Sequence, residues 1–174
     1  MSVWVAGDCN FLLNVKRDNQ IKENWNKTVD KNDEVLIIGD YIKNNIYDDW
    51  YKSTILTINQ DLNGIKTIID YDKDRHGARK DLLEMGFDNI YKMYCFSPDP
   101  IYTTHILSDK ESVLRFIDKN WGAAPRSLSG FSKPFDHNIL SLSIDDWGLT
   151  PIAYTEIPKL VKNMIEFYEI VEGE

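Results

Sequence analysis

The sequence predicts one α/β domain over residues 1–174, built from two sheets that are flanked by helices. In the first half, short apolar runs alternate with segments of helical period, which is typical of parallel strands joined by crossover helices. Three of those runs, at residues 3–6, 35–38 and 67–69, are followed by aspartate, directly or after one glycine. Strand-like segments predominate in the second half, so we expect pairing that is parallel first and mixed later.

The elements of the first half are predicted at 3–7 (strand), 18–29 (helix), 34–40 (strand), 49–61 (helix) and 65–69 (strand). Asp18 or Asn19 is the expected cap of the first helix, and Asn63-Gly64 is expected to end the second. Apolar residues at helical spacing define the inward faces of the two helices: Ile21, Trp25 and Val29, then Tyr51, Ile55, Ile58 and Leu62.

The second half is predicted to begin with a short helix at 77–85 that stops at Gly86. Strands are expected at 89–96, 101–106, 127–129, 139–144 and 152–157. Between them, residues 109–119 are predicted as a helix with Val113, Leu114 and Ile117 facing inward. A closing helix is expected from Pro158, because proline suits the first turn of a helix.

Composition narrows the possible functions. Hydrophobic residues make up 43% of the chain and the net charge is −8, which indicates a folded domain without general affinity for nucleic-acid backbone. The acidic balance favours a protein partner with a basic surface. Two cysteines at unrelated positions predict neither a metal site nor a disulfide, and no signal peptide or membrane span is expected. We therefore expect a cytoplasmic protein.

The aspartates that follow the strands are the first candidate site. The carboxyl ends of parallel strands meet at one edge of a sheet, so Asp8 and Asp40 should lie together with Asp70, Asp72 or Asp74. Carboxylates in contact repel one another and need cations or protons between them. The alternative is that each aspartate only stabilises a turn or caps a helix.

Four blocks of the sequence carry a family resemblance. They are Trp25-Asn26-Lys27-Thr28-Val29, Gly39-Asp40-Tyr41, Leu62-Asn63-Gly64, and Ser143-Ile144-Asp145-Asp146-Trp147. In order and spacing they resemble the calcineurin-like metallophosphoesterases, and in particular the small subgroup with Trp-Asn-x-x-Val. The resemblance covers nearly the whole chain and implies a two-sheet sandwich flanked by helices. It also implies a site for two metal ions with Asp, Asn and His ligands.

Some of the residues that the resemblance marks as metal ligands are retained. Asp8 stands at the first position of the family's Asp-x-His motif, and Asp40 matches the aspartate that bridges the two metals. Asp72 replaces the asparagine of Gly-Asn-His-Asp, and His105 matches an isolated histidine ligand. The resemblance thus implies that a partial ligand set remains.

Other positions have lost their imidazoles. Asn10 replaces the histidine of Asp-x-His, and Lys73 replaces the catalytic histidine. Phe131 and Lys133 stand where the family has Gly-His-x-His. A phenyl ring has no lone pair to donate, and a lysine places a cation where a metal ion would bind. We expect Lys73 to be inactive as an acid, because its ordinary pKa is too high for proton donation near neutrality.

Two arrangements of the altered site stay open. In the first, Lys73 and Lys133 neutralise Asp8, Asp40 and Asp72 as an ion-pair network, and no cofactor is bound. In the second, one divalent metal, manganese or magnesium, is retained. Its ligands would be Asp40, Asp72 and His105, with Asp8 or Asn10 assisting.

The expected function follows the first arrangement: a catalytically degenerate metallophosphoesterase-like protein that binds a protein partner as inhibitor, adaptor or scaffold. The alternative is a weak single-metal phosphoesterase acting on phosphate mono- or diesters, with Lys73 on the phosphate. A third hypothesis is a structural subunit that makes contacts through Trp50, Tyr51 or Trp121. Frequent lysine, asparagine and isoleucine indicate an AT-rich genome, such as that of a bacterium or its phage.

Overall fold

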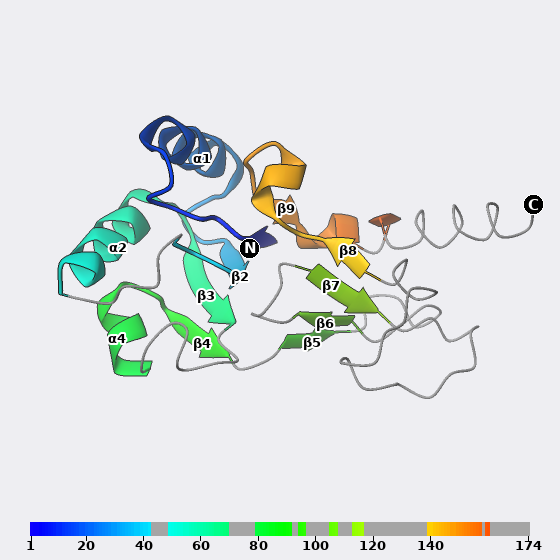
Figure 1. The fold of residues 1–174 in the computed structure, drawn as a ribbon. Helices are drawn as coiled ribbons and strands as arrows, with labels where there is room; N and C mark the ends of the chain where they lie inside the picture. The colour runs from blue at the N-terminus through cyan, green and yellow to red at the C-terminus, as the bar shows by residue number, and fades with distance from the viewer. Residues whose placement is uncertain are drawn as a thin grey trace, which may run out of the picture.

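A computed structural model describes residues 1–42, 49–69, 79–91, 94–96, 105–107, 113–116, 139–157 and 159–160. These residues form two sheets and three α-helices, which confirms the α/β class (Figure 1). Within the described ranges, no helix has the length and apolar character needed to cross a bilayer.

The first sheet has five strands in the order β4-β3-β2-β1-β9. The pairs β1–β2 and β2–β3 are parallel, as predicted. The pair β3–β4 is also parallel, and β9 is antiparallel to β1. The bounds of its strands and of the helices between them are β1 Val3–Gly7, α1 Val15–Thr28, β2 Glu34–Ile38, α2 Asp49–Asp61, β3 Ile65–Ile69, α4 Arg79–Glu84, β4 Asn89–Tyr91 and β9 Ile152–Ala153.

The second sheet has four strands in the order β5-β6-β7-β8, all antiparallel to their neighbours. Its strands are β5 Tyr94–Phe96, β6 His105–Leu107, β7 Val113–Phe116 and β8 Ile139–Ser141. Figure 1 shows α1, α2 and α4 on one side of the five-stranded sheet and the four-stranded sheet on the other.

The helix predicted at 109–119 is wrong, because Val113–Phe116 is strand β7. This segment lies between β6 and β8 and pairs with both, so sheet hydrogen bonds outweigh a weak helical pattern. The expected strand at 89–96 is two strands, β4 and β5, in different sheets. The predicted strand 127–129 and most of the closing helix lie outside the described residues.

Two predicted strands are shorter than expected. The strand predicted at 139–144 ends at Ser141, and a 3-10 helix, η4 (Ile144–Trp147), follows. The strand predicted at 152–157 ends at Ala153 and continues as a second 3-10 helix, η5 (Tyr154–Glu156). The apolar residues that suggested longer strands instead fill the core, since Ile144 and Ile157 are buried.

Helix α1 begins earlier than predicted. Its cap is Asn14, whose side chain accepts a hydrogen bond from the Arg17 amide at 3.1 Å. The predicted cap, Asp18 or Asn19, is therefore wrong, because both residues lie within α1. Asp18 Oδ2 instead accepts from the Leu12 amide at 2.9 Å. The predicted inward face is confirmed, because Ile21, Trp25 and Val29 are buried.

Alternate residues of the central strand pack on opposite faces of the first sheet. Val35 and Ile37 join the larger core cluster, which includes the buried faces of the helices. Leu36 and Ile38 join a second cluster with Leu142, which follows β8. A strand with apolar residues on both faces explains the continuous apolar run in the sequence.

Asp33, just before β2, holds the start of β1. Its carboxylate accepts hydrogen bonds from the Ser2 amide at 2.7 Å, the Asp30 amide at 3.0 Å and the Trp4 indole at 3.0 Å. These donors, the Ser2 amide first, lower the pKa of Asp33 below its ordinary value. The charged form of Asp33 is therefore part of the folded structure.

Candidate functional site

The ends of β1 and β2 bring two of the predicted aspartates together. The Asp8 amide donates to the Ile38 carbonyl at 3.0 Å, and the Asp40 amide donates to Asp8 Oδ1 at 2.8 Å. Gly39, at φ 69°, makes the turn that carries Asp40 back toward Asp8. The predicted meeting of Asp8 and Asp40 at one sheet edge is confirmed.

Asn10 completes this group, and we call Asp8, Asn10 and Asp40 the rim. The Asn10 amide donates to the Asp40 carbonyl at 2.9 Å. The side-chain nitrogen of Asn10 donates to the Asp8 carbonyl at 3.2 Å. Asn10 Oδ1 is therefore the atom of this side chain that could bind a metal. The rim therefore offers two carboxylates and one amide oxygen, which are donors that suit manganese or magnesium better than zinc.

The backbone of residues 8–10, which we call the rim loop, is strained. Asp8 and Asn10 have φ values of 44° and 46°, in the left-handed region. Holding a non-glycine residue there costs about 1–2 kcal/mol, although aspartate and asparagine tolerate it better than most residues. Such strain persists only where the surrounding structure fixes it.

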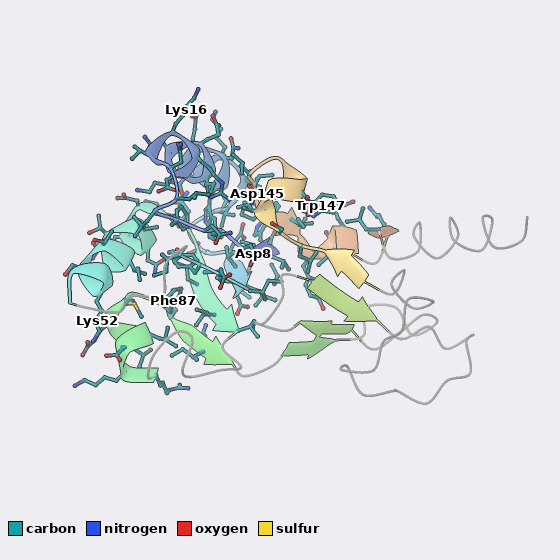
Figure 2. The ribbon with its side chains drawn as sticks, viewed as in Figure 1. Asp8, Lys16, Lys52, Phe87, Asp145 and Trp147 are labelled. Carbon is teal, nitrogen blue, oxygen red and sulfur yellow. The ribbon has the colours of Figure 1, made fainter. Side chains whose placement is uncertain are left out.

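Arg17 supplies much of that fixation. Its Nη1 donates to the Cys9 carbonyl at 2.6 Å and to the Asn10 carbonyl at 3.3 Å. Its Nη2 contacts both carboxylate oxygens of Asp145 at 3.0 Å, and its Nε contacts Asp145 Oδ1 at 3.2 Å. We call this arrangement the Arg17 clamp. Figure 2 labels Asp8 and Asp145, which lie at the end of β1 and on η4 beside α1.

The Arg17 clamp was missed by sequence reasoning. Arg17 lies just before the helix predicted at 18–29, and Asp145 belongs to one of the four family blocks. Nothing in the spacing of two charges so far apart in the chain predicts that they pair.

Tyr41 holds the other side of the rim. Its hydroxyl donates to Asn59 Oδ1, and Asn59 Nδ2 donates to the Met85 carbonyl at 2.7 Å. Its ring makes edge contacts with Phe11 and Phe87, both with centroids 5.2 Å apart. Burial raises the pKa of Tyr41, so the phenol stays neutral and acts as a structural donor.

Cys9 lies inside the rim loop and is fully buried. Burial is the main cause that raises the pKa of its thiol well above the ordinary 9.0, against the opposing field of Arg17. A protonated, buried thiol packs as a small apolar group and is a poor nucleophile.

The other predicted site residues cannot be placed in the same way. Asp72, Lys73 and Lys133 lie outside the described residues. His105 is in β6, where its backbone pairs with Phe96 and Phe116, and only that backbone is described. In the part of the chain that the structure describes, no three His, Cys, Asp or Glu side chains gather as a metal site.

Comparison with known proteins shows a similar fold. No family model and no curated protein matches the chain. A solved structure of a protein of unknown function from Aquifex aeolicus matches with a TM-score of 0.59 and 16% sequence identity. The match covers 91% of this chain and 98% of that chain, so the two proteins share a fold over almost their full lengths.

Proposed function

We propose that this chain is a metallophosphoesterase-like two-sheet sandwich whose dinuclear centre is degenerate, and that it works in the cytoplasm by binding a protein partner. Its role would be that of an inhibitor, adaptor or scaffold. The observation that carries the proposal is the 2.8 Å hydrogen bond from the Asp40 amide to Asp8 Oδ1. Through this bond Asp8, the first candidate metal ligand, stabilises a turn of the backbone.

The surroundings of that bond support the proposal. A cationic group, the Arg17 guanidinium, is hydrogen bonded to the rim loop through the Cys9 and Asn10 carbonyls. The rim is thus held in part by protein groups, which supports the proposal. The histidines that would complete a dinuclear site are replaced in the sequence by Asn10, Phe131 and Lys133.

A second candidate function is a single-metal phosphoesterase. The observation that favours it is the gathering of oxygen donors from Asp8, Asn10 and Asp40 at one sheet edge. With Asp72 and His105, these residues would hold one manganese or magnesium ion. A bound metal would supply an activated water and polarise the phosphoryl group.

Elemental analysis and a hydrolysis assay separate the two candidates. The purified chain is dialysed against manganese, its metal content is measured, and bis-(p-nitrophenyl) phosphate is offered as substrate. The proposal predicts neither stoichiometric metal nor turnover. Turnover that Asp40→Asn abolishes and Asp61→Asn retains would overturn it in favour of the second candidate. Asp61 is a suitable control because it is exposed and pairs with Lys22 on the surface of the helices.

A further inference from the structure

An open groove of about 520 Å³ lies between the start of α1 and the loop that follows η4. We call it the α1 groove. Six residues line it: Leu13, Asn14, Lys16, Arg17, Gln20 and Leu149. In Figure 1 the segment carrying η4 lies beside α1, in agreement with the Arg17–Asp145 ion pair.

The two walls of the α1 groove are fixed to each other. Asn24 Nδ2 donates to the Gly148 carbonyl at 3.1 Å and to the Leu149 carbonyl at 3.3 Å. The Arg17 clamp ties the same two segments at a second point. A groove that exists before a ligand arrives loses less conformational entropy on binding.

Apolar side chains are exposed at this groove. Leu13, which lines the groove, is 45% exposed. Leu149 packs against the larger core cluster at the base of the groove and is only partly buried. Exposed apolar side chains that gather around a hollow are typical of protein-binding surfaces.

The charge of the α1 groove is opposite to that of the chain. The net charge of the chain is −8, yet the two ionisable residues that line the groove, Lys16 and Arg17, are both cations. Lys16 is exposed and forms no ion pair within the described part of the chain. Arg17, in contrast, forms an ion pair with Asp145. Figure 2 shows Lys16 on the outer side of α1. Charge complementarity therefore favours an anionic partner at this place.

We propose that the α1 groove binds a protein segment in which a carboxylate side chain accompanies a large apolar one. The apolar side chain packs between Leu13 and Leu149, and the carboxylate pairs with Lys16. This inference goes beyond the proposed function, because the rim takes no part in it and it holds whether or not the rim binds a metal.

The test uses the full chain and a library of random short peptides. Peptides are selected by display on the purified protein, and the most enriched sequence is synthesised with a fluorophore and titrated by anisotropy. We expect enriched peptides to combine Asp or Glu with a large apolar residue. Lys16→Glu should weaken binding roughly fivefold, as expected for an exposed charge pair. Leu13→Asp should weaken it about tenfold by removing apolar contact.

Lys31→Glu is the control, because Lys31 is exposed, lies beyond the end of α1 and changes the net charge by the same amount. It should alter the affinity less than twofold. Enrichment of basic peptides, no enrichment, or binding insensitive to Lys16→Glu would overturn the inference. Sedimentation is measured in parallel, and a dimer that Leu13→Asp dissociates would show that a second copy of this chain occupies the groove instead.

Discussion

Replacing Arg17 with methionine should destabilise the fold more than removing its carboxylate partner. Methionine keeps the unbranched stem but cannot donate to the Cys9 or Asn10 carbonyls or pair with Asp145. The Arg17 side chain is 14% exposed, whereas that of Asp145 is 52% exposed. The arginine therefore makes its carbonyl contacts in a mostly buried place and its ion pair near solvent.

The expected magnitudes follow from this difference. An exposed ion pair contributes at most about 1 kcal/mol, so Asp145→Asn should cost no more than that. A hydrogen bond from a charged donor contributes about 1.5–3 kcal/mol, and the bond to the Cys9 carbonyl, at 2.6 Å, is of this kind. Arg17→Met should therefore lower the free energy of unfolding by about 2–3 kcal/mol.

Urea denaturation followed by tryptophan fluorescence measures the effect, since Trp25 is fully buried. With a slope of about 2 kcal/mol per molar urea, the midpoint should fall by about 1 M for Arg17→Met and by less than about 0.5 M for Asp145→Asn. Lys16→Met, on the neighbouring exposed residue, should leave the midpoint unchanged. Equal shifts for Arg17→Met and Asp145→Asn would refute the reasoning, because the carbonyl contacts would then contribute nothing.

Three further changes probe other parts of the fold. Tyr41→Phe leaves the buried Asn59 Oδ1 without its donor and should cost about 1–3 kcal/mol in urea denaturation. Asp33→Asn should lower the melting temperature at neutral pH. The pKa of Asp33 is lower in the folded protein than its ordinary value of 3.8. The stability that the charged carboxylate contributes is therefore present above pH 3.8 and is lost as the pH falls through the folded pKa. The melting temperatures of the two proteins should thus converge in acid. Gly64→Ala would place a methyl group 2.9 Å from a valine side chain at φ +93°, and should cost about 1–3 kcal/mol more than Gly148→Ala. Gly148 has a similar φ of +71°, but an added methyl there meets no described atom within 4 Å, so it is the matched control for calorimetry.

The parts of the fold that sequence analysis predicted are those in which one local pattern has one meaning. The run from Val35 to Ile38 can be satisfied only by burial on both faces, and it became the central strand β2. Parallel strands in turn imply that their carboxyl ends meet, which placed Asp8 beside Asp40.

The failures arose where the same residues fit two structures. Val113 and Leu114 suit a helix or a strand equally well in so short a segment, and pairing with β6 and β8 decided between them. In the site, Asp8 fits both of the roles that the sequence left open: it accepts from a backbone amide, and its place as a metal ligand stays a prediction. The Arg17 clamp could not be predicted, because an ion pair has no sequence period.

The position of β1 has a consequence for the order in which the chain can fold. One edge of β1 pairs with β2, but the other edge pairs with β9, at Trp4–Ala153 and Val5–Ile152. A ribosome delivers β1 long before β9, so during synthesis that edge of β1 has unsatisfied amides and carbonyls. Unpaired edges recruit other strands. Nascent or truncated chains lacking residues 152–153 should thus self-associate through the open edge of β1.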